Sequence, residues 1–487
     1  MSLKWASVPL FLLLSITSGL CGASSFENTA VVRTVELGGS VVHVTTTYAI
    51  RALENNLKTY TIALGKEDRA KTSWVEVKVK GQDNTLPFTE RVEKHLSLFD
   101  VTLPKPLSGN KTLNIVFENI QTHATTPWPQ TAAQNEDQAL KYTTDLFVLS
   151  PYSTLVQRTK LRALTPRFIS WAEPQGIDAF VGDAAVTKNG ANVVYGPYKD
   201  VPPSTLDNFL EKYQQPVTVH YFHEQPVLEV RKLNRAVEIS HWGANINIQD
   251  DISLYNAGPK LKGHFSRIEH QMQGYNKKGA PHVLPALTLG LPPGIRNTYY
   301  YDTIGNVSTS KLRVAPLPPK GAQRSQYSIL ELRPRYPLLG GWNYSFTLGW
   351  DAPLESSASY DKKTGTYIVA IPILTPIPGA VITDEELKII LPEGATDVSY
   401  VTPFPALSAV MGTHVTFLDT VGRPSITLRY KNLTLKHAQE IYVTYKVSTL
   451  AHIKKGLTVA TALFTLFVLA GVARRLDFSI NRKKKVQ

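Results

Sequence analysis

The chain has 487 residues, and its 52 Lys and Arg outnumber its 39 Asp and Glu to give a formal net charge of +13. A charge of this size first suggests nucleic-acid binding. Much of the excess lies at the two ends, however. Residues 24–453 keep a net charge of about +5 and contain no basic run with interleaved aromatic residues. Composition therefore excludes a nucleic-acid-binding protein.

Residues 1–23 have the pattern of a secretory signal peptide. Lys4 precedes an apolar run from Val8 to Leu14, and the small residues before position 24 suit cleavage after Ala23. The only cysteine, Cys21, lies in this segment. The mature chain would then lack cysteine, which excludes thiol catalysis, thiolate metal sites and disulfides, so that its stability must come from core burial.

Alternation of apolar and polar residues dominates residues 24–453 and predicts many short β-strands. In the run Val75–Val79, valines alternate with charged residues, as in a strand with one solvent-exposed face. Gly38-Gly39 separates two β-rich runs that can form a hairpin. The best helical candidates are short, at 136–141 and 204–213, and no internal repeat of fixed period is visible. Short strands punctuated by Pro and Gly predict a mainly β fold with two antiparallel β-sandwich-like domains, residues 24–230 and 231–453.

Residues 333–350, RPRYPLLGGWNYSFTLGW, hold the densest group of aromatic residues. The two glycines allow a tight turn, and the aromatic residues that follow share one face of a strand: Trp342, Tyr344, Phe346 and Trp350. We expect this face to belong to the core of a sheet. An aromatic contact surface for a partner is the alternative.

The segment Gly456–Ala473, GLTVATALFTLFVLAGVA, has eighteen residues without a charge. It reaches about 27 Å as a helix, close to the hydrocarbon thickness of a bilayer. Basic residues flank it, so we predict a transmembrane helix over 454–473 and a short basic cytosolic tail over 474–487. With the signal peptide, this predicts a single-pass type I membrane protein whose bulk is luminal. A buried helix of a soluble protein is the alternative.

The span and the tail carry two candidate sites. Gly456 with Ala460, and Thr461 with Thr465, are small residues four positions apart, a spacing that allows close helix packing in lipid, so we predict a docking face for a partner's helix. The end of the tail, Lys484-Lys485-Val-Gln, resembles the dilysine retrieval signal of type I proteins resident in the endoplasmic reticulum. A plain stop-transfer cluster attracted to anionic lipid is the alternative.

Four Asn-x-Ser/Thr sequons lie in the predicted luminal region. In that compartment they are candidate glycan acceptors on exposed loops: Asn110, Asn306, Asn343 and Asn432. Asn343 is the weakest candidate, because an aromatic-rich strand surrounds it.

The histidine and acidic clusters do not form a recognisable reactive site. On a strand His220 and Glu224 share a face while His223 points away, and the HExxH spacing is absent. We interpret Asp250-Asp251 as a turn or exposed edge and Asp384–Glu386 as a solvated cluster. Phosphate-binding, dinucleotide-binding and serine-hydrolase motifs are missing from the sequence. We therefore expect no catalytic residue, no cofactor and no metal, and interpret the luminal region as a binding or scaffolding module.

Six motifs, in order along about 195–400, carry a resemblance to a known family. The longest are 299–310, YYYDTIGNVSTS, and 333–350; the shorter ones are Tyr195–Tyr198, Glu238–Gly243, Leu261–Arg267 and Leu391–Ala395. Together with the signal peptide and the single span, they resemble ribophorin I, a subunit of the oligosaccharyltransferase of the endoplasmic reticulum.

The resemblance implies a non-catalytic subunit of a complex that transfers an oligosaccharide from dolichyl diphosphate to Asn-x-Ser/Thr of nascent proteins. It implies as partners a catalytic multispanning subunit, small membrane subunits and client polypeptides, and a role in stabilising the complex and retaining clients. Animal members have a long cytosolic extension linked to ribosome contact, which the tail over 474–487 lacks, so that role is not carried over. The alternative is a stand-alone type I receptor or chaperone that binds glycans or clients.

Overall fold

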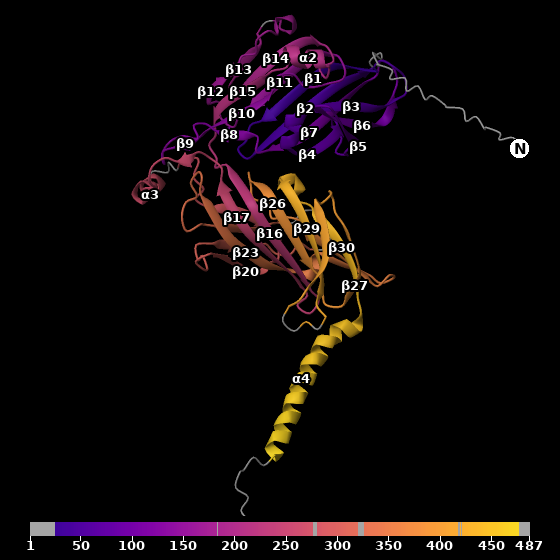
Figure 1. The fold of residues 1–487 in the computed structure, drawn as a ribbon, viewed down its shortest axis with the longest axis vertical. Helices are drawn as coiled ribbons and strands as arrows, with labels where there is room; N and C mark the ends of the chain where they lie inside the picture. Colours follow the sequence, from indigo (N-terminus) through magenta and orange to yellow (C-terminus); the bar gives the residue numbers. More distant parts are fainter. Residues whose placement is uncertain are drawn as a thin grey trace, which may run out of the picture.

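A computed structural model describes residues 25–182, 184–275, 280–319, 326–416, 419 and 421–476. Two β-rich halves are stacked along its long axis, and one long helix leaves the second half at the end away from the first (Figure 1). The signal peptide predicted over 1–23 and the chain beyond residue 476 lie outside the described residues. The predicted mainly β fold, with antiparallel sheets and a C-terminal apolar helix, is confirmed.

A seven-stranded sheet forms the base of the first half. Its order is β13-β14-β11-β1-β2-β7-β4, and every neighbouring pair is antiparallel except β1 and β11. The predicted hairpin at Gly38-Gly39 is confirmed as the β1–β2 connection. The strands are β1 (Phe26–Glu36), β2 (Val41–Ala52), β4 (Thr72–Val79), β7 (Thr112–Thr122), β11 (Thr154–Arg162), β13 (Val186–Asn189) and β14 (Asn192–Val201).

Two smaller sheets, β3-β6-β5 and β12-β15-β10-β8, cover one face of this base. On β2, Val42 and Val44 pack with the four-stranded sheet, whereas Tyr48 and Ile50 pack with the three-stranded sheet. Alternate residues of a strand point to one side, so both small sheets lie on the same face and meet at a seam. Their strands are β3 (Leu57–Gly65), β5 (Phe88–Glu93), β6 (Leu96–Leu107), β8 (Thr125–Pro127), β10 (Ala139–Asp145), β12 (Phe168–Trp171) and β15 (Pro216–Phe222).

The second half has the same plan. Its large sheet has the order β20-β23-β17-β16-β26-β29-β28, with β16 parallel to β26, and β19-β22-β21 and β24-β25-β30-β27 are the small sheets. The strands are β16 (Leu228–Ser240), β17 (Asn245–Asn256), β19 (Leu287–Leu291), β20 (Arg296–Asp302), β21 (Lys311–Arg313), β22 (Ser328–Leu332), β23 (Asn343–Pro353), β24 (Ala358–Asp361), β25 (Thr366–Pro372), β26 (Val381–Ile390), β27 (Ala395–Val401), β28 (Ser408–His414), β29 (Arg423–Leu433) and β30 (Glu440–Val447).

The two halves match strand for strand in chain order. Strands β1 to β7 correspond to β16, β17 and β19 to β23, and strands β8 and β10 to β15 correspond to β24 to β30. The two strands outside this scheme, β9 (Thr131–Ala132) and β18 (Lys260–Leu261), pair with each other and link the halves. The sequence shows no repeat of fixed period, so the duplication is one of topology rather than of residue pattern.

The remaining elements are short, except for the last helix. They are α1 (Lys66–Lys71), η1 (Asp178–Phe180), α2 (Asp207–Tyr213), α3 (Arg267–Tyr275), η2 (Leu354–Ser356), η3 (Leu435–His437) and α4 (Thr449–Arg475). The helix expected over 204–213 is present in shortened form as α2. The helix expected over 136–141 is wrong, because strand β10 begins at Ala139 and pairs with β15.

The change from one set of sheets to the other falls between Phe222, the end of β15, and Leu228, the start of β16. The division at residue 230 into two domains stays a prediction. The expectation that the aromatic face over 342–350 belongs to a core is confirmed: on β23 the side chains of Tyr344, Phe346 and Trp350 are buried, and Trp342 packs against the same core.

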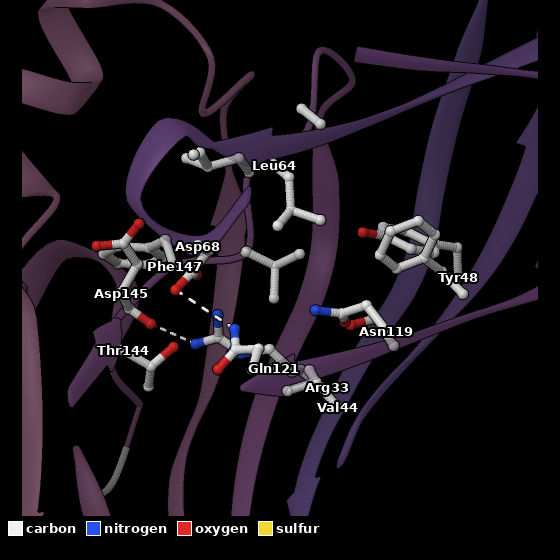
Figure 2. A pocket seen from close by; sticks show the side chains of 16 residues that line it. Arg33, Val44, Tyr48, Leu64, Asp68, Asn119, Gln121, Thr144, Asp145 and Phe147 are labelled. Atoms are coloured by element: carbon white, nitrogen blue, oxygen red, sulfur yellow. Dashed lines mark hydrogen bonds between the residues drawn. The ribbon is translucent and has the colours of Figure 1, made fainter. Parts of the chain in front are cut away.

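A buried arginine on the base sheet lies at the seam of each half. In the first half, Arg33 of β1 donates a hydrogen bond from its Nη2 to the carbonyl oxygen of Asp145, where β10 ends (Figure 2). The same nitrogen donates to the carbonyl oxygen of Leu146 at 3.3 Å. A cavity of about 40 Å³ beside it is lined by the side chains of Asp68 and Gln121, among others. Burial raises the pKa of the Asp145 carboxyl to about 6, against the opposing effect of Arg33.

Arg235 of β16 occupies the corresponding place in the second half. Its side chain is fully buried, and it donates to both carboxylate oxygens of Asp250 at 2.7 and 2.9 Å and to the carbonyl oxygen of Pro372, where β25 ends, at 3.0 Å. Thr375 also donates to Asp250, at 2.9 Å. The interpretation of Asp250-Asp251 as a turn or exposed edge is therefore wrong, because Asp250 lies in the middle of a central strand.

Glu385 of β26 lies near this ion pair and is also fully buried. Among the described residues neither of its carboxylate oxygens has a hydrogen-bond partner. Burial raises its pKa to about 8, with Arg235 opposing the shift and Asp250 adding to it. The interpretation of Asp384–Glu386 as a solvated cluster is therefore wrong for its middle residue, which faces the core between β16 and β29.

Replacing Arg235 with Met would leave Asp250 buried without its cation. We expect the unfolding free energy of the second half to fall by about 3–5 kcal/mol. The matched control is Arg429→Met, which removes an exposed pair with Glu386 and should cost about 0–1 kcal/mol. Urea unfolding of the full chain measures both by tryptophan fluorescence, since Trp350 lies 5.8 Å from the Arg235 guanidinium. Equal losses in the two variants would contradict a buried ion pair.

Glu385 should make the second half less stable as the pH rises. Its pKa is about 8 in the folded chain and ordinarily 4.5. Between these values the folded chain holds a proton that the unfolded chain has lost, so the unfolding free energy falls by about 1.4 kcal/mol per pH unit. Glu385→Gln removes this dependence, and its advantage in unfolding midpoint should grow from about pH 5 to about pH 8. Glu386→Gln is the control, and a constant difference between Glu385→Gln and the unaltered chain would contradict the assignment.

Candidate partner-binding surfaces

Helix α4 is the one candidate membrane span within the described residues. It has 27 residues, an 18-residue window with a mean hydropathy of 2.1, and no buried residue in that window. Only Ser448 separates it from β30, and the Ser448 hydroxyl accepts a hydrogen bond from the Ala451 amide at 3.2 Å. The predicted span over 454–473 lies inside this helix, which begins five residues earlier because of that cap.

Three threonines within the apolar part of α4 bond their hydroxyl groups to the helix backbone. Thr458, Thr461 and Thr465 each donate to the carbonyl oxygen four residues earlier at 2.8 Å, which removes the cost of placing a hydroxyl in lipid. All four residues of the predicted docking face are exposed. At about 100° per residue, Gly456 with Ala460 and Thr461 with Thr465 form two stripes about 140° apart rather than one face.

The two stripes differ in what lies beside them. Trp242, in the turn between β16 and β17, points its ring at Gly456, and a Cβ atom there would lie 3.6 Å from the tryptophan Cη2. Trp242 and Ala460 line the same cleft. The Gly456 stripe is therefore partly covered by this chain itself, and docking of a partner on either stripe stays a prediction.

The sequons lie in different surroundings. Asn110, in a turn with a positive φ of 61°, Asn306 and Asn343 are exposed. Asn432 is half-buried, and its side chain hydrogen-bonds the ring of His123, which also bonds Glu229 at 3.0 Å. Because His123 belongs to the first half and Asn432 to the second, this sequon lies at the junction of the halves.

Further polar and aromatic contacts join the two halves. Gln134 and the backbone of Ser266 exchange two hydrogen bonds at 2.8 and 2.9 Å. Trp74 packs edge-on against His437, with ring centroids 4.9 Å apart. Sequence reasoning missed this junction, because its contacts join residues more than 100 positions apart and no local pattern links such residues.

The histidines that raised the question of a metal site do not converge. His220 Nε2 lies 2.7 Å from the Trp128 carbonyl oxygen, Glu224 lies 3.8 Å from Arg167, and His223 is buried, which lowers its pKa to about 4. Within the described ranges, no group of three or more His, Cys, Asp or Glu side chains could hold a metal ion.

The two longest sequence motifs meet in the second half. Asp302 of β20 accepts hydrogen bonds from Arg335 Nε at 2.5 Å and from the Tyr344 hydroxyl at 3.2 Å. Arg335 also donates to the carbonyl oxygens of Gly305 and Asn306, so it holds the loop that carries a sequon. Motifs 299–310 and 333–350 are thus two parts of one hydrogen-bond network.

A profile of the Ribophorin I family matches residues 26–474, which include every strand and nearly all of α4. The chain belongs to the ribophorin I family. It is 27% identical over 475 residues to subunit 1 of the dolichyl-diphosphooligosaccharide–protein glycosyltransferase of Caenorhabditis elegans, covering 97% of this chain and 76% of that protein. It is 30% identical over 385 residues to subunit 1B from Arabidopsis thaliana, covering 79% of this chain and 76% of that protein.

Among solved structures, yeast LTA4 hydrolase matches 44% of this ribophorin I family member and 31% of its own chain, with 10% identity and a TM-score of 0.24. A TM-score this low assigns neither a shared fold nor an activity. The resemblance to ribophorin I that the sequence motifs indicated is confirmed by the family profile. The retrieval signal predicted at Lys484 and Lys485 lies outside the described residues and stays a prediction.

We expect three of the four sequons of this ribophorin I family member to carry glycans. Asn110→Gln, Asn306→Gln and Asn343→Gln should each remove one endoglycosidase-sensitive step in gel mobility, because these side chains are exposed. Asn432→Gln should leave the mobility unchanged, because its side chain is used at the junction. A lost step in Asn432→Gln would show that the junction accommodates a glycan and would contradict this assignment.

Proposed function

We propose that this chain is a non-catalytic subunit of an oligosaccharyltransferase complex in the membrane of the endoplasmic reticulum. The complex would transfer an oligosaccharide from dolichyl diphosphate to Asn-x-Ser/Thr of nascent proteins. The match of the family profile over residues 26–474 carries this proposal. The relatives named as subunit 1 of the transferase support it, since the alignment to the worm protein covers 97% of this chain.

The proposed orientation places both β-rich halves in the lumen and the tail in the cytosol. The signal peptide pattern over 1–23 and the basic residues after α4 support it. The exposure of Asn110, Asn306 and Asn343 agrees with a luminal location, where such sequons are glycosylated.

The way in which three acidic residues are used supports a structural rather than a catalytic role. Asp250 is bound to a buried arginine, Asp302 fixes the loop of a sequon through Arg335, and Glu385 is fully buried. Each of these three carboxylates is engaged within the fold, either in an ion pair or by complete burial in the core. This chain would then stabilise the complex and retain client polypeptides through its large β surfaces.

We place the docking of a partner's transmembrane helix on the Thr461 and Thr465 stripe. Both side chains are small, and their hydroxyls are already bonded within the helix, so another helix can approach closely at little cost. The Gly456 stripe is less suited, because Trp242 already occupies the space that the glycine leaves open.

Purification of the tagged full chain in mild detergent, with an assay of glycan transfer to a sequon peptide, tests the proposal. We expect a stoichiometric set of membrane partners and transferase activity. Thr461→Leu with Thr465→Leu should lower the recovery of small membrane partners, whereas Ala470→Leu, on the opposite side of the helix, should not. A lone, inactive protein from intact membranes would overturn the proposal in favour of a free-standing receptor or chaperone.

A further inference from the structure

An open apolar cleft lies where α4 leaves the second half. Its volume is about 570 Å³, and its walls are the β16–β17 turn and the first turns of the helix. The lining residues that matter are Trp242 from the turn and His452, Ile453, Gly456, Leu457 and Ala460 from the helix. Trp242 is 67% exposed, a large value for so bulky and mainly apolar a side chain.

Contacts on both sides hold the walls of the cleft in place. His241, next to Trp242, stacks on His452 with centroids 5.2 Å apart, and its Nε2 lies 2.8 Å from the Tyr445 hydroxyl. On the other side of the helix start, a Cβ atom on Gly394 would lie 2.8 Å from the Ala451 side chain, so the chain passes close to α4 there. These contacts hold the turn that carries Trp242 next to the first turns of α4.

The position of the cleft along α4 sets its depth in a bilayer. The uncharged segment begins at Gly456 and is about as long as the hydrocarbon layer is thick, so Gly456 lies near the boundary of that layer. The ring of Trp242 lies beside Gly456 and therefore at the same level, where tryptophan is enriched in membrane proteins.

Further exposed apolar side chains surround the cleft. Leu450, at the start of α4, is 78% exposed. Val421, two residues before β29 begins, is 66% exposed. The Val421 amide donates to Glu393 at 3.0 Å, and Glu393 lines a neighbouring pocket together with Trp242 and His452. The same end of the second half thus presents apolar residues from three segments next to the candidate span.

We propose that this cleft binds a phospholipid of the luminal leaflet through an acyl chain that packs against Trp242, Leu457 and Ala460. The apolar floor continues directly into the exposed surface of α4, and the ring of Trp242 stands at the boundary of the hydrocarbon layer, so an acyl chain in the cleft would leave its headgroup at the interface. A partner's helix fits less well, since helices pack at about 8–10 Å between axes and the ring of Trp242 stands in that space. The inference rests on the proposed function only through the spanning of the membrane by α4.

Brominated phospholipids test this proposal, because bromine quenches tryptophan on contact. The full chain and Trp242→Phe are reconstituted in phosphatidylcholine bilayers brominated near the headgroup or near the chain ends. The difference between the two proteins isolates the emission of Trp242. We expect shallow bromines to remove at least about twofold more of this emission than deep bromines, since the ring lies at the interface.

A second tryptophan separates failure of this proposal from failure of the proposed topology. Leu463→Trp in the Trp242→Phe background places a ring about 10 Å deeper on α4. Deep bromines should quench it if the helix spans the bilayer. Quenching at 463 without quenching at 242 would overturn the lipid cleft, whereas no quenching at 463 would overturn the span itself.

Retained lipid provides a measurement that does not depend on fluorescence. Ala460→Leu fills the cleft, and Ala462→Leu adds the same volume on another side of the helix. After purification in mild detergent, we expect Ala460→Leu and Trp242→Ala to carry about one phospholipid fewer per chain than the unaltered protein. Ala462→Leu should retain the full amount. Equal phospholipid content in all four proteins would contradict a built site.

Discussion

A buried arginine at the seam of three sheets is the contact on which each half depends. Two small sheets side by side cannot close over one large sheet without leaving strand-end carbonyls inside the core, where unpaired polar groups are costly. Arg33 and Arg235 supply donors at those places, to Asp145 and Leu146 in one half and to Pro372 in the other. The burial of a cation then requires negative groups nearby, which explains why acidic residues are buried in chain segments that otherwise look like ordinary strands.

The two halves solve the same problem differently. The second half neutralises its arginine with Asp250 through two charge-assisted bonds and keeps Glu385 protonated beside the pair. The first half uses carbonyl oxygens and leaves a small cavity whose mixed lining includes Asp68 and Gln121. The half that carries α4 therefore has a buried ion pair at its seam, whereas the half at the far end pairs its arginine with carbonyl oxygens (Figure 1).

Local patterns in the sequence were enough for those parts of the fold that depend on neighbours along the chain. The Gly38-Gly39 hairpin, the aromatic core face of β23 and the apolar helix follow from periodicity and turn residues. The burial of Asp250 and Glu385 did not, because alternation fixes which side of a strand a residue faces but not whether that side is covered. The cleft at Trp242 joins residues about 210 positions apart, and the duplicated topology leaves no residue pattern, so both required the three-dimensional arrangement. Docking on the helix stripes and glycan occupancy remain predictions.

The single residue between β30 and α4 has a mechanical consequence. Ser448 caps the helix, His241 stacks on His452, and Gly394 lies against Ala451. The start of the helix is therefore packed against the second half, with no flexible linker between them. In the proposed orientation, any tilt that the bilayer or a neighbouring helix imposes on α4 would be transmitted as rotation of the whole β-rich body. The first half, at the opposite end of that body, would sweep the widest arc above the membrane. Bilayer thickness could thereby govern where the outermost β surface stands.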